Sequence, residues 1–414
     1  MVHQTMNTST ASASMASRSN RSMGRRVGQW AAGAILGLLA GCASVVLPPE
    51  GAPGPASPPP AAAPAPVPPD AVLPPALTTA KSRWVPVDWQ ELPGFGEDSL
   101  HEAWNAWLKS CERPPVPLAA LCPQVRQLSI ASPQDQRAWL VSALQPYRVE
   151  TLEGASEGLL TAYYEPVLEG RRQPSASHAV PLYGVPAGLG QRKPWFSRQE
   201  IDTLPEARAQ LRGRELAWIS DPVDALMLQI QGSGRIRITE PDGSQTLVRL
   251  AYAATNDHPY RSVGGWLLQQ GAVRDASWPG IKAWVRANPQ RVQEMLWSNP
   301  RTVFFRVEPL APLDAALGPR GAQGVPLTPG RSIAVDKASI PYGTPVWLAT
   351  PGPQARLARL VLAQDTGSAI VGAVRADWFV GWGDEAGELA GRLKQPLRLW
   401  VLWPRASLPQ AAAR

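Results

Sequence analysis

The sequence is poor in the residue types that build metal centres and nucleic-acid surfaces. Its 414 residues include 4 histidines and 3 cysteines, and no Cys/His pair stands at the spacing of zinc ligands. We therefore expect no metal and no cofactor. No run of lysine and arginine is interleaved with aromatic residues, so no nucleic-acid partner is expected. The chain also lacks an apolar run long enough to span a membrane as a mature helix.

Residues 1–41 have the layout of a secretion signal. Four arginines and no acidic residue precede a short apolar run from Trp30 to Ala40, and Gly41 and Cys42 follow it. The cysteine after these small residues resembles the lipobox of bacterial lipoproteins, in which that cysteine is acylated. This resemblance implies that Cys42 is a lipid anchor on the periplasmic face of the outer membrane, since no aspartate follows it. An ordinary signal peptide with a chance cysteine is the alternative.

The composition of residues 42–80, rich in proline and alanine, predicts a tether. From Pro48 to Pro75, 13 of 28 residues are proline, so no packed core can form there. Such a segment favours extended polyproline conformations and acts as a semi-rigid spacer. The net charge of the whole chain is +7, and the leader's four arginines account for four of these charges, which leaves +3.

The region after the tether predicts helices with a buried face. Trp104 and Trp107 fall at helical spacing, and we expect them in a core rather than against a sugar. Cys111 and Cys122 lie close together in the sequence. In an oxidising compartment they could form a disulfide that closes a short loop, and two free buried thiols are the alternative.

Beyond Tyr147 the pattern changes to short strands with turns. Runs such as GLLTAYYEPVLEG and LMLQIQGSGRIRI predict an antiparallel β region, and residues 262–300 return to short helices. Six apolar runs bounded by proline and glycine then predict a small closed barrel: RTVFFRVE, SIAVD, TPVWLAT, RLARLVLAQD, VRADWFVGW and LRLWVLW. The expected fold class is therefore mainly β with peripheral helices.

Three aspartates end or follow strands of this barrel region. Asp336 follows SIAV, Asp365 follows LVLAQ, and Asp377 lies in RADWF. Because strand tips converge at a barrel rim, these acids can lie together and raise one another's pKa. An acid that is protonated near neutral pH is what general acid catalysis needs. Each aspartate alone could instead cap a turn.

Two other stretches carry groups that suit sugar binding. In LMLQIQGSGRIRI, amides and a flexible turn could contact a ligand through Gln229, Gln231, Gly232, Ser233 and Gly234. A β-bulge or hairpin turn without a ligand is the alternative.

The stretch GLLTAYYEPV offers aromatic rings and an acid. Tyr163 and Tyr164 could stack on a sugar ring, and Glu165 could supply a second carboxylate. A strand with core aromatics explains this stretch nearly as well.

Together these motifs resemble the membrane-bound lytic murein transglycosylase A family, whose members are bacterial outer-membrane lipoproteins. The resemblance runs from about Gly158 to Pro404, and it rests in chain order on TAYYEPV, LQIQGSGRI, AYAATNDHPYRSVG, NPRTVFFR, VPLTPGRSIAVDKASIPYGTPVWL, AQDTGSAIVGAVRADWFVGWGDEAGELAGR and WVLWP. It implies a double-psi β-barrel domain, a smaller inserted β domain and a groove between them. We place the helical N-terminal part of the barrel domain at 81–159, the insert at 160–295 and the remaining barrel domain at 296–405.

The resemblance also implies a reaction. Members cleave the β-1,4 bond between N-acetylmuramic acid and N-acetylglucosamine in peptidoglycan without water, and close a 1,6-anhydro ring on the muramic residue. By the motif AQDTG, Asp365 would be the single catalytic acid and base, while Asp336 and Asp377 would support the site. Ser368 stands where many relatives carry a second glycine. The implied partners are peptidoglycan glycan strands, the outer membrane through the lipid anchor, and cell-wall synthesis complexes.

Two other functions fit single features of the sequence. Asp-Thr-Gly is also the signature of aspartic peptidases, but a single-chain peptidase needs a second such loop, and none occurs. A non-catalytic glycan-binding lipoprotein would use the same groove and anchor. The apolar run before Asp365 disfavours it, because burying an unused acid costs free energy.

Overall fold

The computed structural model of the protein describes residues 73–311 and 314–405. The chain divides into two units after Ala61, and all described residues belong to the second unit. The leader, Cys42 and most of the tether lie outside the described residues. The signal, the lipid anchor and the spacer therefore stay predictions.

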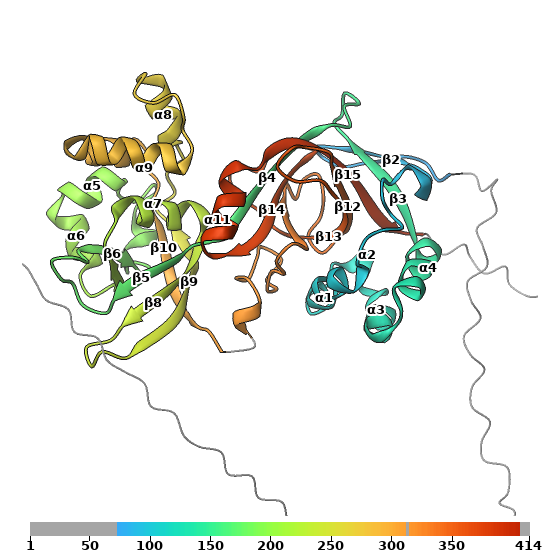
Figure 1. The fold of residues 1–414 in the computed structure, drawn as a ribbon, viewed down its shortest axis with the longest axis horizontal. Helices are drawn as coiled ribbons and strands as arrows, with labels where there is room; N and C mark the ends of the chain where they lie inside the picture. Colours follow the sequence, from blue (N-terminus) through green and yellow to red (C-terminus); the bar gives the residue numbers. More distant parts are fainter. Residues whose placement is uncertain (1–72, 312–313, 406–414) are drawn as a thin grey trace, which may run out of the picture. The chain divides into compact units, whose positions relative to one another are not determined.

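One sheet forms a closed barrel. Its strands are β1 (Leu77–Thr78), β2 (Arg83–Pro86), β3 (Leu144–Glu150), β4 (Gly158–Glu165), β11 (Ser332–Val335), β12 (Pro345–Thr350), β13 (Leu357–Asp365), β14 (Arg375–Trp382) and β15 (Lys394–Pro404). They follow the order β1-β2-β3-β15-β12-β13-β11-β14-β4, and β15 also pairs with β4. This extra pairing joins β15, β12, β13, β11, β14 and β4 into a ring (Figure 1). The closed barrel expected from the sequence is confirmed.

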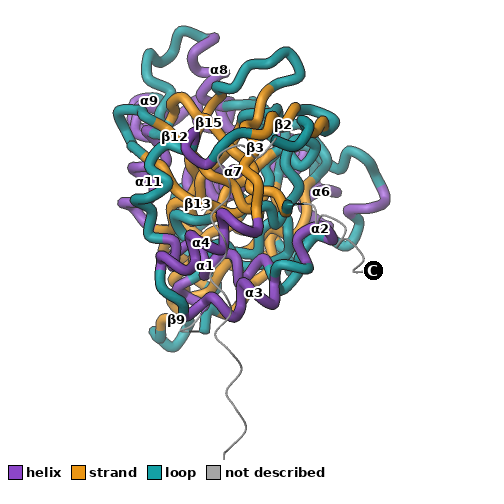
Figure 2. The backbone as a smooth tube through the Cα atoms, turned by 90° about the vertical axis from the view of Figure 1, so that its right-hand side faces the viewer, coloured by secondary structure: helices purple, strands orange, loops and turns teal. Residues whose placement is uncertain are grey.

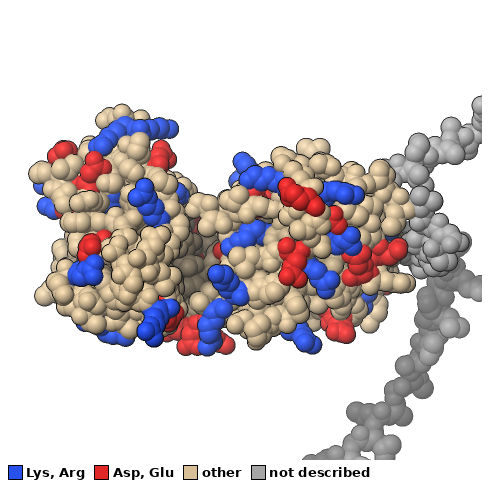
Figure 3. Space-filling view, turned by 90° about the horizontal axis from the view of Figure 1, so that it is seen from above, with Lys and Arg blue, Asp and Glu red and all other residues tan. Residues whose placement is uncertain are grey.

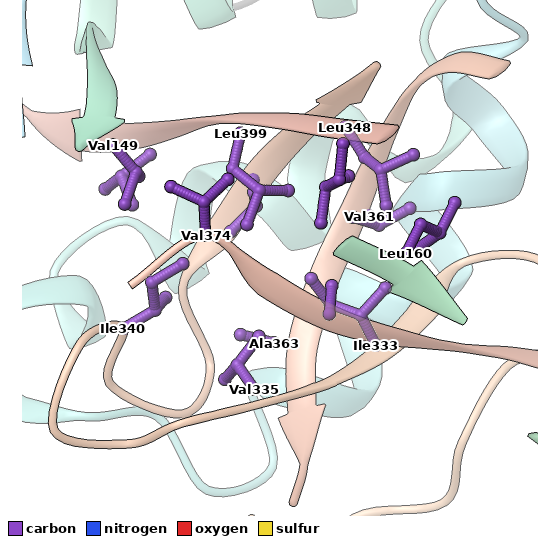
Figure 4. Close-up of a cluster of buried hydrophobic side chains, with 14 of the residues drawn as sticks. Val149, Leu160, Ile333, Val335, Ile340, Leu348, Val361, Ala363, Val374 and Leu399 are labelled. Atoms are coloured by element: carbon purple, nitrogen blue, oxygen red, sulfur yellow. The ribbon is translucent and has the colours of Figure 1, made fainter. Parts of the chain in front are cut away.

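The barrel interior is filled by branched aliphatic side chains. Leu160, Ile333, Val361 and Leu399 are fully buried there and come from different strands of the ring (Figure 4). Alternate residues of a strand point to opposite faces, so the other face of each strand needs its own cover. Strand β12 is buried at every position, which shows that both of its faces are covered.

Four helices pack on the outer face of the barrel at β12, β13 and β15. They are α1 (Leu100–Ser110), α2 (Val116–Ala119), α3 (Cys122–Gln127) and α4 (Pro133–Ala143). Trp104 and Trp107 of α1 are each 1% exposed and pack with Trp347 of β12, so their predicted place in a core is confirmed. A disulfide joins Cys111 to Cys122 and ties the end of α1 to α3.

The second sheet belongs to the chain between β4 and β11. Its strands are β5 (Val167–Arg171), β6 (Val180–Tyr183), β7 (Glu215–Ile219), β8 (Ser233–Thr239), β9 (Gln245–Thr255) and β10 (Val303–Pro309), in the order β10-β9-β8-β5-β7-β6. The accompanying helices are α5 (Arg198–Thr203), α6 (Pro205–Leu211), α7 (Pro222–Gln231), α8 (Val263–Gln269), α9 (Trp278–Ala287) and α10 (Val292–Trp297). Helix α11 (Gly383–Arg392) instead packs on β4 and β14 of the barrel. In Figure 2 most helices lie around the strands, in agreement with the predicted mainly β fold with peripheral helices.

Strand β10 differs from the sequence prediction. It was expected to be the first strand of the barrel, but it pairs antiparallel with β9 in the second sheet. Val303 and Phe305 are buried in the core of that sheet, and Phe304 packs on the opposite side with Trp195. The apolar pattern of β10 therefore reflects burial on both faces of the second sheet. The predicted domain bounds themselves stay a prediction.

Helix α7 also differs from the sequence prediction, which gave a strand. Asp221 caps its first turn through its side chain, and Gly232, at φ 82°, ends it. Leu226 and Leu228 alternate as in a strand, but they are buried in different cores. Leu226 packs with helices α8 to α10, and Leu228 packs in the core of the second sheet. A helix buried on two sides shows no single apolar stripe, which explains the misleading pattern.

The described surface carries charges of both signs. Lysine and arginine are interspersed with aspartate and glutamate on the face displayed in Figure 3. Within residues 73–311 and 314–405, no helix has the length and apolar character needed to cross a membrane.

Candidate active site

Two of the three predicted aspartates lie on one row across the barrel. Asp365 ends β13 and pairs with Ala334 of β11, and Asp377 of β14 pairs with the same alanine from the other side. Thr161 of β4 continues the row next to Asp377. Two strand spacings therefore separate the aspartates, about 10 Å between their Cα atoms.

A β-bulge directs the Asp365 side chain. Strand β13 has one extra residue, Gln364, against β11 directly before Asp365. The Gln364 amide nitrogen donates to the carbonyl of Ala106 and to the hydroxyl of Ser110, both on α1 and both at 2.8 Å. Because a bulge re-aims the neighbouring side chain, this anchored glutamine fixes the direction of Asp365.

Hydrogen bonds to both oxygens hold the carboxyl group of Asp365. The Tyr163 hydroxyl donates to Oδ2 at 2.8 Å, and the Ala322 backbone N–H donates to Oδ1 at 2.9 Å. The Ala322 loop comes close because Gly321 has no side chain. A Cβ atom at Gly321 would lie 2.5 Å from the Gln364 carbonyl oxygen. Both oxygens of Asp365 are thus fixed in position.

The surroundings raise the pKa of Asp365. Burial is the largest cause and raises this pKa from 3.8 to about 6, with a smaller contribution from the charge of Asp377. Hydrogen bonds from Thr366, Tyr163 and Ala322 act in the opposite direction. Protein surrounds the carboxyl group, yet the residue keeps partial exposure to solvent, so a ligand can reach it. This is the environment expected of a general acid.

Asp377 is the second acid of the row. Burial raises its pKa, while a hydrogen bond from the Thr161 hydroxyl and the charge of Arg375 lower it. The net change is upward. In its ionised form, Asp377 makes a small contribution to the raised pKa of Asp365.

Asp336 follows β11 and binds other groups. Its Oδ2 accepts hydrogen bonds from the Lys81 ammonium and from the Gly372 N–H, each at 3.0 Å. Burial raises the pKa of Asp336, but these hydrogen bonds outweigh burial and lower it overall. Of the mutual rise in pKa expected for three acids, only the effect of Asp377 on Asp365 is found, because burial raises the pKa of Asp377 and the pKa of Asp336 is lowered.

The two tyrosines of β4 point to opposite faces of the strand. Tyr163 reaches Asp365, a contact that differs from the stacking predicted for it. Tyr164 is 8% exposed, packs against Gly387 of α11, and its hydroxyl lies 3.0 Å from the Met227 sulfur. Its ring has no open face for a sugar.

The two predicted amides hold groups of the protein. Gln229 Oε1 accepts from the Arg198 guanidinium at 2.6 Å, and Gln231 Oε1 accepts from the Tyr164 backbone N–H at 3.1 Å. These bonds join α7 to α5 and to β4. Their role in substrate binding stays a prediction.

The turn that follows α7 makes its close contacts within the protein. Gly232 ends the helix, while Ser233 and Gly234 begin β8 and are buried. A Cβ atom at Gly234 would lie 2.3 Å from a methyl group of Leu228 and 3.0 Å from the Pro166 carbonyl oxygen. The glycine therefore permits helix α7 to pack on β8, and substrate binding here also stays a prediction.

Glu165 is not available as a second catalytic carboxylate. It is fully buried between Arg235 at 3.2 Å and Arg249 at 2.8 Å. Both guanidinium groups also donate to the Leu317 carbonyl. This triad connects the barrel strand β4 to β8 and β9 of the second sheet.

Sequence reasoning missed four residues that shape the site. Thr161, Gly321, Ala322 and Gln364 were not singled out. Gln364 could have been identified from the sequence, because an amide inside the apolar run LVLAQD needs buried hydrogen-bond partners. Ala322 contributes only its backbone N–H, which no side-chain pattern can identify.

Comparisons with known proteins agree with this architecture. Two family models match the chain, one described as the MltA specific insert domain at residues 159–306 and one as the 3D domain at residues 331–403. The membrane-bound lytic murein transglycosylase A of Vibrio cholerae is 34% identical over 263 residues, which cover 61% of this chain and 67% of that protein.

Solved structures of relatives share the fold. A lytic transglycosylase of Burkholderia pseudomallei is 43% identical, with a TM-score of 0.55 over 80% of this chain and 98% of that chain. Escherichia coli MltA with bound chitohexaose is 26% identical, with a TM-score of 0.61 over 74% of this chain and 90% of that chain. With the matching insert, barrel and relatives in one chain, this protein belongs to the membrane-bound lytic murein transglycosylase A family.

Proposed function

We infer that this protein is a lytic transglycosylase that cleaves peptidoglycan and that Asp365 is its catalytic acid and base. The observation that carries the role of Asp365 is its environment: a partly accessible carboxyl group with a pKa of about 6, fixed by Tyr163 and Ala322. Near neutral pH a useful fraction of such an acid is protonated.

The proposed reaction uses one carboxyl group twice. Protonated Asp365 donates its proton to the glycosidic oxygen between N-acetylmuramic acid and N-acetylglucosamine as that bond breaks. The resulting carboxylate then takes the proton of the muramoyl C6 hydroxyl while its oxygen bonds to C1, which closes the 1,6-anhydro ring and restores the acid. An internal hydroxyl has a high effective concentration and outcompetes water.

A reaction with one catalytic acid is supported because Glu165 and Asp336 are both bound by other groups of the protein. Hydrolytic glycosidases use a second carboxylate as nucleophile or base. Glu165 is locked between two arginines, and Asp336 is bound to Lys81 and Gly372. We propose that Asp336 orders the loop after Asp365 by holding Gly372, and that Asp377 keeps the pKa of Asp365 raised.

We infer the substrate and the location of this protein from its relatives. The Escherichia coli relative was solved with bound chitohexaose, and we propose that this chain binds a glycan strand at Asp365. The curated relatives are named membrane-bound. Acylation of Cys42 would hold the protein on the periplasmic face of the outer membrane, where cell-wall synthesis complexes are the proposed protein partners.

The test is a digest of purified peptidoglycan by the full-length protein, with the products analysed by mass spectrometry. Fragments that end in 1,6-anhydromuramic acid are expected. Fragments that end in reducing muramic acid would identify a hydrolase and contradict the proposed reaction. Binding of peptidoglycan without any cleavage would restore the alternative of a non-catalytic wall-binding lipoprotein.

A further inference from the structure

A cavity of about 570 Å³ lies at the barrel end of β13 that is opposite to Asp365. Its walls come from the loop before α1, from the β12–β13 hairpin and from β15. Arg359 is one of its lining residues and precedes Asp365 by six positions on the same strand, about 20 Å along the chain. The cavity is therefore separate from the catalytic acid, and its volume suits a ligand of small-molecule or short-peptide size.

Four arginines line this cavity, and one of them is bound by two carboxylates. Arg331 is 2% exposed and binds Asp98 and Glu102, each at 2.8 Å. The same oxygen of Asp98, Oδ2, also accepts a hydrogen bond from the Leu360 backbone N–H at 2.9 Å. Both carboxylates are thus already used by groups of the protein.

The other three arginines lack such partners. Among residues 73–311 and 314–405, no carboxylate lies within 4.0 Å of Arg356, Arg359 or Arg398. Arg356 and Arg398 are exposed, while Arg359 lies over the Trp378 ring at 5.6 Å. The lining contributes Glu97 as one further acid that makes no ion pair in the described chain. With four arginines against the acids Glu97, Asp98 and Glu102, the lining of the cavity has a net charge of +1.

Arg359 contains a donor that needs an acceptor. Its Nε is buried without a hydrogen-bond partner, and its Nη1 makes one long contact of 3.5 Å to the Gly330 carbonyl. A buried donor without a partner costs about 1–3 kcal/mol. Guanidinium groups offer a planar fork of donors that matches a carboxylate.

From these observations we propose that the cavity binds the carboxylate groups of the peptide stems that peptidoglycan carries. The inference rests on the proposed function, because it takes peptidoglycan as the substrate. Arg356, Arg359 and Arg398 receive the carboxylates, and Glu97 suits an amino group on the same peptide. The site anchors the substrate far from the scissile bond, so it acts on substrate binding and leaves the chemical step unchanged.

The test compares two substrates and two variants. Soluble glycan strands that carry peptide stems are compared with the same strands after an amidase has removed the peptides. The variant Arg356→Gln/Arg398→Gln removes two exposed arginines of the cavity. The control Arg274→Gln/Arg286→Gln removes two exposed arginines elsewhere and changes the net charge equally.

The expected result is a rise in KM on the order of tenfold for peptide-bearing strands in the cavity variant, with kcat unchanged. KM for the peptide-free strands should stay the same, and the control should match the parent on both substrates. An unchanged KM for peptide-bearing strands, or an equal rise for both substrates, would overturn the peptide site while the proposed function stands. A parent protein that cleaves neither substrate would overturn the proposed function and this inference with it.

Discussion

At Asp365, burial and hydrogen bonding act in opposite directions on one carboxyl group. Burial raises its pKa to about 6, while donors from Thr366, Tyr163 and Ala322 lower it. The balance leaves a group that can be an acid before bond cleavage and a base after it. A carboxyl group with the ordinary pKa would be almost fully ionised at neutral pH and a poor proton donor.

The first prediction at this scale concerns pH. Because Asp365 must be protonated to act as the acid, kcat/KM should fall about tenfold for each pH unit above roughly pH 6. Initial rates on peptidoglycan between pH 4.5 and pH 8.5 would measure this limb. A rate that stays level up to pH 8 would mean that another group supplies the proton.

The second prediction concerns Tyr163. Its hydroxyl donates to Asp365 and lowers the pKa of that carboxyl group, so Tyr163→Phe should move the alkaline limb of kcat/KM to higher pH by up to about one unit. Tyr183→Phe, in the second sheet, is the matched control and should leave the limb in place. An identical limb in both variants would show that Tyr163 does not position the acid.

The elements show where sequence patterns are informative. Five strands of the ring, β11 to β15, were predictable because each is an apolar run bounded by proline or glycine, and β11, β13 and β14 each carry or precede an aspartate. The sixth strand, β4, was assigned to the other β region, because its pairing with β14 and β15 depends on long-range closure. Helix α7 was mistaken for a strand because two cores bury it. Asp221 and Gly232 at its ends were signals that outweigh the alternation between them.

The buried triad of Glu165 gives a prediction for the link between β4, β8 and β9. Glu165→Ala would leave Arg235 and Arg249 buried without their carboxylate and should cost about 3–5 kcal/mol of unfolding free energy. Glu169 of β5 forms an exposed pair with Arg237, so Glu169→Ala should cost less than about 1 kcal/mol. Urea unfolding of both variants measures the difference. Equal losses would show that the triad does not stabilise the link.

On the scale of the whole molecule, barrel closure assembles the site from distant segments. Tyr163 stands 202 positions before Asp365 in the chain, and Ala322 precedes Asp365 by 43 positions. The motif AQDTG identified Asp365, but the register of β4 and the path of the Gly321 loop are long-range results of closure. No local pattern specifies them, which is why Thr161, Gly321 and Ala322 were missed.

The most direct test of this account is the rate at which Asp365→Asn releases fragments ending in 1,6-anhydromuramic acid. Asparagine has the same shape, and it can accept from Ala322 and donate to the Tyr163 oxygen, so the site should keep its structure. The predicted rate is about 10²–10⁴-fold below that of the parent protein. Asp336→Asn and Asp377→Asn should retain more activity. An Asp365→Asn rate within tenfold of the parent would contradict the assignment of Asp365 as the catalytic acid.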